Sequence, residues 1–426
     1  MSPMTAHVPP AWMDHAIWWH VYPLGFTGAP RALDPAAPVA HRLGRVEAWL
    51  DHARRLGVNG LQLGPVFRSA THGYDTLDHF AVDPRLGDRD DLARLIEAAH
   101  ARGIRVMLDG VFNHVSREHP IAVEALAAGP DSDAGRLVRW DRDAPGGPRP
   151  RVFEGHDALV ELDHSQPAVA DLVASVLEHW CALGVDAWRM DAAYAVPPSL
   201  WARVLPRVRA RFPEVLALGE VIHGDYPGII AASTLDSLTQ YELWKAIWSS
   251  IESRNLFELN WSLLRHNAFL ETFVPTTFVG NHDVTRIASR VGDEGAAVAA
   301  AILFAVGGMP VVYEGDELGM TGVKEDRAGG DDAVRPAFPE DPADAARSPR
   351  AARMLRRHQD LVGTRRRHPW LVRATTRATL LENEHAVWEV LGAEPGQRLA
   401  LEVDLRGDRP RARVRDASGP LFDSWD

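Results

Sequence analysis

The fold is decided by two helix–strand pairs, RVEAWLDHARRLG (45–57) with GLQLGPVF (60–67), and RDDLARLIEAAHARG (89–103) with IRVMLD (104–109). The first member of each pair is amphipathic and is closed by glycine, which is a common helix end. The second member is a short apolar run of the kind that forms buried strands. Helix and strand therefore alternate in this part of the chain.

Six further apolar runs extend this alternation over most of the sequence. They are IWWHVYPL (17–24), VDAWRMD (185–191), VLALGEV (215–221), SLTQY (237–241), PTTFVGN (275–281) and MPVVYEG (309–315). Eight strands that alternate with helical segments predict an α/β protein built on a parallel (β/α)8, or TIM, barrel.

Two regions depart from the alternation. Residues 111–163 contain the turn-rich stretches GPDSDAG and DAPGGPRP, and they make the third crossover longer than one helix requires. After about residue 372 the pattern changes to the β-like runs TLLENEHAVWEVLG and RLALEVDLRG. We therefore predict a catalytic barrel over 12–110 and 164–371, an inserted domain B over 111–163 and a small C-terminal β domain over 372–426.

The composition limits the kinds of molecule that the protein can bind. The formal charge is 46 − 58 = −12, which offers no basic surface to nucleic acid or to an anionic membrane and favours a neutral substrate. No stretch approaches the ~20 apolar residues of a membrane span. The start, MSPMTAHVPPAWMDHA, lacks the basic and apolar parts of a secretory signal, so we expect a cytoplasmic protein.

The cysteine and tryptophan counts further limit the kinds of site and partner to expect. Cys181 is the one cysteine, which excludes an intramolecular disulfide or a multi-cysteine metal site, and its apolar setting predicts a buried thiol. The chain has 14 tryptophans against 6 tyrosines, and sugar faces stack well on indole. This excess favours a carbohydrate partner, although packing in the core explains most tryptophans.

Acidic residues stand at the ends of four different predicted strands. In a (β/α)8 barrel the active site forms at the carboxyl ends of the strands, so polar residues there carry functional weight. One such acid is usually a helix cap or half of an ion pair. Four that converge on one mouth repel each other, which makes catalysis a better explanation than structure. The set consists of Asp109, Asp191, Glu220 and Asp283, with His114, Arg189, Asn281 and His282 beside them.

Glycoside hydrolysis explains why such a set is needed. A retaining glycosidase uses one carboxylate as nucleophile and a second carboxyl as proton donor, about 5–5.5 Å apart. The donor also needs a raised pKa, which burial and neighbouring acids can provide.

The motifs around these acids resemble a known family. DGVFNH (109–114), DAWRMD (186–191), GEV (219–221) and FVGNHD (278–283) are similar, in order and spacing, to the four signature regions of the α-amylase family of glycoside hydrolases. Three other segments also resemble that family and extend the likeness over about residues 12–370. They are GYDTLDHFAVDPRLGDRDDL (73–92), ELDHSQPAV (161–169) and GGMPVVYEGDELGM (307–320).

The resemblance implies roles for individual residues. Asp191 matches the nucleophile, Glu220 the general acid/base, and Asp283 the third acid that holds substrate hydroxyls. Arg189 matches the residue that orients the nucleophile and keeps it ionised, which suits a guanidinium that cannot lose its proton. Asp109 matches a residue that supports the site through hydrogen bonds.

The resemblance also implies substrate-binding residues. His114 and His282 match histidines that hydrogen-bond the sugar at the cleavage point, and Tyr74 matches the aromatic platform under it. Asp331 and Arg335, four apart in GGDDAVRP, look like a further pair that contacts its hydroxyls, with Asp332 as the alternative acid.

Two departures from the family concern calcium and the branch within the family. Asn113 matches a calcium ligand of many secreted amylases, but the lysine–histidine pair after the nucleophile is replaced by Tyr194 and Ala195. This change argues against both calcium and a starch-liquefying role, and Asn113 could equally be a turn residue. No cofactor is expected to be required and no metal site is predicted, with calcium as the alternative that is left open. The chain looks more like the neopullulanase, cyclomaltodextrinase and small-glucoside branches, without the amino-terminal domain through which many of those dimerise.

The expected activity is retaining hydrolysis of α-glucosidic, mainly α-1,4, linkages in maltooligosaccharides or related glucans. A transglycosylase or sugar isomerase on the same scaffold, of the glucanotransferase or trehalose-forming type, is the alternative. A catalytically inactive sugar-binding protein is a third hypothesis, which the retention of Asp191, Glu220 and Asp283 disfavours. Chain-length preference, endo or exo attack and oligomeric state stay open, and Trp140, Trp244 and Trp248 could line further subsites or pack in the core.

Overall fold

Eight parallel strands form the centre of the molecule in the computed structural model, which describes residues 7–327 and 329–425. They are β1 (Trp18–Val21), β2 (Gly60–Leu63), β5 (Arg105–Val111), β10 (Ala187–Asp191), β11 (Leu216–Gly219), β12 (Ser237–Leu238), β13 (Thr276–Phe278) and β14 (Met309–Tyr313). Seven of these strands lie inside the runs predicted from the sequence, and β5 extends two residues beyond the end of its run at residue 109.

The ring of strands closes between β12 and β13. The strand order β12-β11-β10-β5-β2-β1-β14-β13 is that of consecutive barrel strands, and an isolated parallel bridge joins Thr239 to Thr276. The backbone N–H of Gln240 donates to the carbonyl of Thr276 at 2.8 Å, and Ser237 Oγ lies 2.8 Å from Thr276 Oγ1. The predicted (β/α)8 barrel is therefore confirmed.

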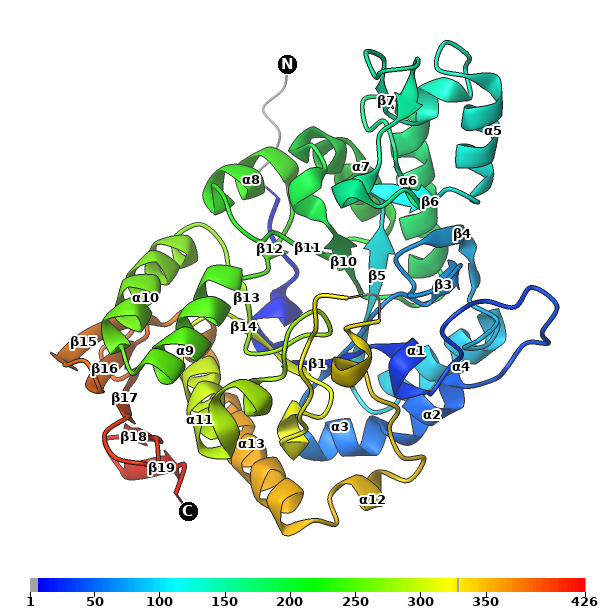
Figure 1. Ribbon diagram of the computed structural model, residues 1–426. Helices are drawn as coiled ribbons and strands as arrows, with labels where there is room; N and C mark the ends of the chain where they lie inside the picture. The colour runs from blue at the N-terminus through cyan, green and yellow to red at the C-terminus, as the bar shows by residue number, and fades with distance from the viewer. Residues whose placement is uncertain (1–6, 328, 426) are drawn as a thin grey trace.

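Helices surround the strands, as Figure 1 shows. Where the sequence predicts one helix over 45–57 the chain forms two, which meet at Trp49; this residue has φ −92°, ψ −3°, and its ring stacks on Trp19. The helices are α1 (Pro23–Phe26), α2 (Leu43–Ala48), α3 (Leu50–Leu56), α4 (Arg89–His100), α6 (Pro167–Cys181), α7 (Pro198–Arg211), α8 (Tyr226–Ser233), α9 (Tyr241–Ser253), α10 (Leu256–Leu270), α11 (Ile287–Ala305), α12 (Pro342–Ala345) and α13 (Pro349–Arg367). In the described parts of the chain, none of the helices meets the length and apolarity that a bilayer crossing requires.

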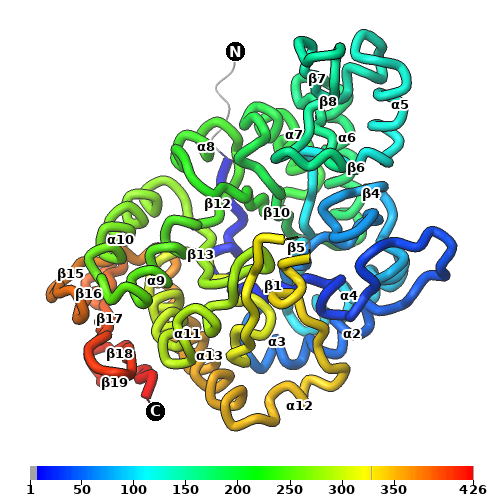
Figure 2. The backbone as a smooth tube through the Cα atoms, in the orientation of Figure 1, coloured from blue at the N-terminus to red at the C-terminus, as the bar shows by residue number. Residues whose placement is uncertain are grey.

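Two excursions from the barrel rise on its carboxyl side. After β2 the chain forms the hairpin β3 (Phe67–Ser69) and β4 (Thr76–Val82). After β5 it forms a lobe with a small apolar core of its own, seen at the upper right of Figure 2. The elements of this lobe are β6 (His114–Ser116), α5 (Pro120–Ala128), β7 (Trp140–Asp141), β8 (Arg149–Pro150) and β9 (Leu159–Glu161).

The chain ends in a five-stranded antiparallel sheet. Its strands pair in sequence order, and the buried indole of Trp388 donates to Asn260 of α10 at 3.0 Å, which ties the sheet to the barrel helices. The predicted C-terminal β domain is thus present. Its strands are β15 (Thr375–Leu381), β16 (His385–Leu391), β17 (Arg398–Asp404), β18 (Arg411–Asp416) and β19 (Gly419–Asp423).

The barrel interior is filled by side chains from alternate strand positions. Trp18, Met107, Leu218 and Met309 pack there, and the indole of Trp18 points its N–H at the sulfur of Met309, 3.1 Å away. Gly60 on the neighbouring strand leaves room for the Trp18 ring, because a Cβ at this position would overlap the ring.

We therefore expect Gly60→Ala to destabilise the fold by about 1–3 kcal/mol, since the ring has no space into which to move. Gly44→Ala is the matched control, because no atom lies within 4 Å of its Cβ position and the residue is inside α2. Thermal or urea unfolding of both variants tests this. Equal stability of the two variants would contradict the packing argument.

Candidate active site

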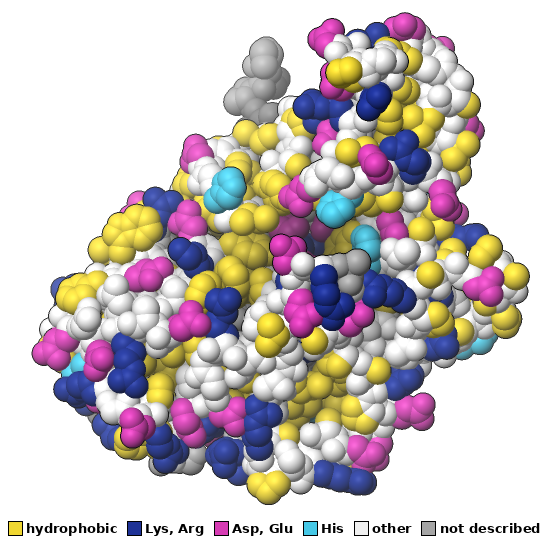
Figure 3. Space-filling model, in the orientation of Figure 1, with side chains coloured by type: hydrophobic (Ala, Val, Ile, Leu, Met, Phe, Trp, Pro, Cys, Tyr) yellow, Lys and Arg dark blue, Asp and Glu magenta, His cyan; other side chains and the backbone are white. Residues whose placement is uncertain are grey.

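A hollow opens at the carboxyl ends of the barrel strands, beside the lobe formed by residues 111–163. Figure 3 shows acidic side chains and histidines around it. The strands place the acids predicted from the sequence there: Asp109 lies within β5, Asp191 ends β10, and Glu220 directly follows β11. Asp283 follows β13 after a short turn.

Arg189 of β10 lies between three of these acids. Its Nη1 atom is 2.6 and 2.7 Å from the two carboxylate oxygens of Asp109 and 3.3 Å from Asp191 Oδ1. Its Nη2 atom is 2.5 Å from Glu220 Oε1. The guanidinium is buried, so each of these contacts is made away from bulk water.

One cation does not neutralise three acids, and the pKa values of Asp109 and Asp191 are therefore raised. Burial raises the pKa of Asp109 to about 6, although Arg189 opposes the rise. Burial and the charge of Glu220 raise the pKa of Asp191, again against Arg189. Asp109 and Asp191 therefore hold a proton more readily than solvent-exposed aspartates would.

Glu220 is held at both carboxylate oxygens. Its Oε2 atom accepts the backbone N–H of Ala192 at 3.0 Å, and its Oε1 atom accepts the hydroxyl of Tyr241 at 3.1 Å. Ala192 directly follows the Asp191 position and has φ +47°, a left-handed conformation that costs a residue other than glycine energy. The strained turn points the backbone donor at Glu220.

Asp283 and His282 are placed by Arg335. The guanidinium of Arg335 donates to Asp283 Oδ1 at 2.7 Å and to the carbonyl of His282 at 2.8 Å. His282 Nε2 lies 3.1 Å from Asp283 Oδ2, and burial, followed by the charges of Arg335 and Arg189, lowers the pKa of the imidazole. We therefore expect His282 to be neutral near pH 7.

The structure separates Asp331 from Asp332. Asp331 lies 3.3 Å from Arg335 and 3.3 Å from Lys324, so it faces the site. Asp332 pairs with Arg31 at 3.1 Å and is largely exposed. Of the two alternatives, Asp331 is the acid that the fold brings to the pocket.

Tyr74 and His114 lie at the rim and contact each other. The hydroxyl of Tyr74 donates to Asp109 at 3.0 Å, and its ring is parallel to that of His282 at a centroid distance of 5.4 Å. His114 Nε2 donates to the carbonyl of Tyr74 at 3.0 Å, and its ring stacks on Phe153 of the inserted lobe. His114 therefore ties the loop that carries Tyr74 to that lobe.

Two tyrosines belong to the site although the sequence motifs do not single them out. Tyr22, after β1, stacks on His282 at 5.6 Å and lies under the guanidinium of Arg335. Tyr241, after β12, contacts Glu220. Both lie near the ends of apolar runs that the sequence predicts as strands. Because the active site of a barrel forms at the carboxyl ends of its strands, this position could have identified them as site residues.

The three tryptophans considered as subsites have packing partners. Trp140 donates to the carbonyl of Gly135 at 2.8 Å inside the lobe. Trp244 packs against Phe278, and Trp248 lies under the guanidinium of Arg290. Cys181 is buried as predicted, and burial raises the pKa of its thiol to about 12.

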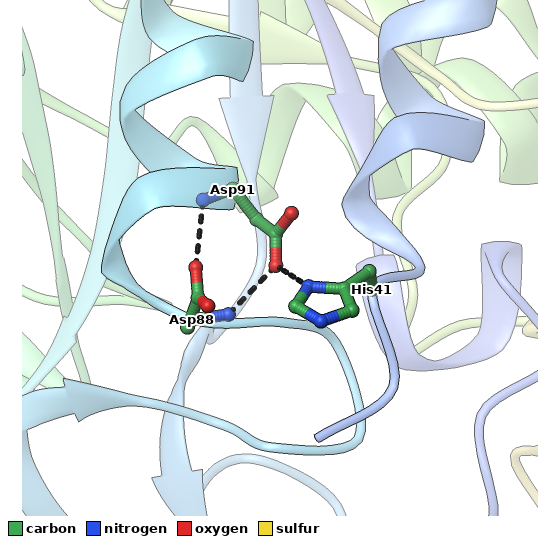
Figure 4. Close-up of side chains that lie close together, drawn as sticks. All are labelled: His41, Asp88 and Asp91. Carbon is green, nitrogen blue, oxygen red and sulfur yellow. Dashed lines mark hydrogen bonds and ion pairs between the residues drawn. The ribbon is translucent and has the colours of Figure 1, made fainter.

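The nitrogen end of the Asn113 amide faces its neighbour His114: Nδ2 lies 3.2 Å from His114 Nδ1 and donates to it. Calcium is bound by the oxygen end of an amide, which this contact does not occupy. Of the described residues, His41, Asp88 and Asp91 are a group of possible ligands, but Figure 4 shows their carboxylates bonded within the group and capping α4.

Acids gathered around one arginine at the mouth of an eight-stranded barrel are groups of the kind that glycoside hydrolysis uses. The family model for the α-amylase catalytic domain matches residues 43–144 and 151–379 of the chain. The chain belongs to the α-amylase family of glycoside hydrolases.

Individual members of the family share less than a third of their residues with this chain in the two alignments that follow. A cyclomaltodextrinase of a Bacillus species is 28% identical over 76% of this chain and 62% of its own length. An intracellular maltogenic amylase of Bacillus subtilis is 28% identical over 74% of this chain and 57% of its own. The chain thus spans about 60% of the length of these curated relatives.

Among solved structures, the chain is similar to a hydrolase from Arthrobacter globiformis. That structure is cyclic α-maltosyl-(1→6)-maltose hydrolase in complex with cyclic α-maltosyl-(1→6)-maltose. The TM-score is 0.80 at 25% identity, and the match covers 94% of this chain and 92% of the other.

Removing the central cation should destabilise the protein in a pH-dependent way. We expect Arg189→Met to lower the free energy of unfolding by about 3–5 kcal/mol, because it leaves buried acids without their partner. Because the folded-state pKa values of Asp109 and Asp191 lie above their unfolded values, these acids favour the folded state at low pH and oppose it as pH rises. The stability lost in Arg189→Met should therefore increase between pH 5 and pH 8.

Thermal unfolding at several pH values measures this effect. Arg207→Met is the control, since Arg207 pairs with Glu178 and Asp171 at the surface. A loss for Arg189→Met that is independent of pH would contradict the assignment of Arg189 as the counter-ion of the cluster.

Proposed function

We propose that the protein is a retaining α-glycosidase that cleaves α-glucosidic linkages, mainly α-1,4, in maltooligosaccharides or related glucans. The observation that carries the proposal is the contact of one buried guanidinium with both Asp191 and Glu220. This contact keeps two carboxyl groups together at the mouth of the barrel, as retaining hydrolysis requires.

The coupling between the two acids suits their separate roles. The charge of Glu220 is a main reason for the raised pKa of Asp191, after burial. When Glu220 carries a proton, that repulsion disappears, and Arg189 then favours the ionised form of Asp191. The pair thus supplies an anionic nucleophile and a proton donor at the same pH.

The reaction then follows in two steps. Asp191 attacks the anomeric carbon while Glu220 gives its proton to the departing oxygen, which leaves a covalent glycosyl-enzyme. Glu220 next takes a proton from water, and the resulting hydroxide displaces Asp191, so the α configuration is retained. Asp283, fixed by Arg335, is placed to accept hydrogen bonds from substrate hydroxyls.

The proposed substrate class rests on relatives and on charge. The related cyclomaltodextrinase and the hydrolase solved with a cyclic maltosyl-maltose are named for α-glucan substrates. A net charge of −12 also agrees with a neutral saccharide. We further propose a cytoplasmic location, which the name of the intracellular Bacillus subtilis relative supports.

Asp191→Asn and Glu220→Gln should each lower kcat/KM on maltotriose by at least about 10³-fold, because each removes a group that acts on the reacting bond. Both variants nearly preserve side-chain volume, so folding is checked by thermal unfolding. Near-normal turnover by either folded variant would overturn the catalytic role assigned to that carboxyl group.

A time course with maltose, maltotriose and a longer maltooligosaccharide, resolved by chain length, tests the reaction itself. Hydrolysis predicts that only shorter sugars accumulate, because water accepts the glycosyl group. Products longer than the input, or disaccharides with a new linkage, would instead show a transglycosylase or isomerase. Absence of turnover on all three sugars would contradict the proposed substrate.

A further inference from the structure

A chain of hydrogen bonds connects the loop after β13 to Glu220. The backbone N–H of Asp283 donates to Asn281 Oδ1 at 2.9 Å, and Asn281 Nδ2 donates to the hydroxyl oxygen of Tyr241 at 2.9 Å. The hydroxyl of Tyr241 then donates to Glu220 Oε1 at 3.1 Å.

The direction of this chain is fixed by its first bond. Because a backbone N–H can only donate, it sets the oxygen of the Asn281 amide towards Asp283 and the nitrogen towards Tyr241. The amide N–H then occupies a lone pair of the tyrosine oxygen, so the hydroxyl hydrogen points to Glu220. Tyr241 is therefore a donor to the carboxylate.

Tyr241 is also held rigidly. Its ring meets Phe278 of β13 edge to face at 4.9 Å and Trp244 of α9 at 5.7 Å. The residue begins α9, two residues beyond the bridge between Thr239 and Thr276 that closes the barrel. Its hydroxyl thus has one position relative to the barrel mouth.

The two oxygens of Glu220 are not equivalent in this arrangement. Oε1 receives Tyr241 and Arg189, which together occupy both of its lone pairs, whereas Oε2 receives only the N–H of Ala192 among the described residues. One lone pair of Oε2 stays available for a proton.

We propose that Tyr241 is a positioning residue for the acid/base Glu220: with Asn281 behind it, its hydroxyl anchors Oε1 so that Oε2 carries the transferred proton. This inference rests on the proposed glycosidase function and assigns a part of that site which the sequence motifs do not contain. Other charged or titratable groups also interact with Glu220 from the neighbouring strands and loops, namely Arg189, Asp191, Asp109 and Tyr194.

The test compares Tyr241→Phe with Tyr226→Phe. Tyr226 is a matched control, because it is buried and its hydroxyl contacts the main-chain carbonyls of Ile222 at 3.1 Å and Val221 at 3.5 Å rather than the carboxyl group of Glu220. Two substrates are used: maltotriose, whose leaving group needs a proton, and 2,4-dinitrophenyl α-maltoside, whose leaving group does not. The value of kcat/KM reports the first step, in which Glu220 acts as acid.

We expect Tyr241→Phe to lower kcat/KM on maltotriose by roughly 10- to 100-fold and on the aryl maltoside by less than about threefold. The alkaline limb of the pH profile on maltotriose should move to higher pH, because the carboxylate form loses a donor. Tyr226→Phe should change neither quantity. Asn281→Ala, which keeps the hydroxyl but removes its orientation, should give the same pattern with a smaller loss.

Equal losses on both substrates, an unmoved alkaline limb or full activity of Tyr241→Phe would each overturn the inference. If thermal unfolding shows that Tyr241→Phe does not fold, Asn281→Ala takes its place in the test, with the same comparison of kcat/KM on the two substrates and of the alkaline limb. Failure of the proposed function has a different signature, because the wild-type protein would then turn over neither substrate, and the inference would fall with it.

Discussion

A single buried cation, Arg189, is the constraint on which the site depends. Three acids would not stay together at the mouth of the barrel without it, since each would keep its proton or move to water. It lies within strand β10, whose pairing on both sides fixes its position in the barrel. One guanidinium thus contacts Asp109, Asp191 and Glu220 and holds their carboxyl groups together.

A second buried arginine fixes the other half of the pocket. Arg286 donates to the carbonyl of Glu314 at 2.7 Å, to Asp316 at 3.1 Å and to the carbonyl of Val334 at 2.9 Å. It thereby joins the segment after β13 to the two segments after β14. Asp283 lies just before Arg286 and Arg335 lies just after Val334, so this junction brings that pair together.

Much of the architecture could be predicted because its signals are local. The eight strands are short apolar runs between amphipathic segments, and their order required no knowledge of contacts. The acids could be placed for a similar reason, because every parallel strand of a barrel ends on the same face. The break at Trp49 could not be foreseen, because the amphipathic pattern of 45–57 continues across it; the ring of Trp49 stacks on Trp19, which is distant in the sequence.

The sequence by itself determined the barrel, the excursion over 111–163, the terminal β sheet and the acids that meet at the mouth. Only the tertiary structure decided between Asp331 and Asp332, since the two are adjacent in sequence and differ in which arginine they meet. It also decided that Tyr241, from a run predicted as a strand, donates to Glu220. Such contacts join residues from different strands and loops, and a local pattern carries no information about which distant atom a side chain will face.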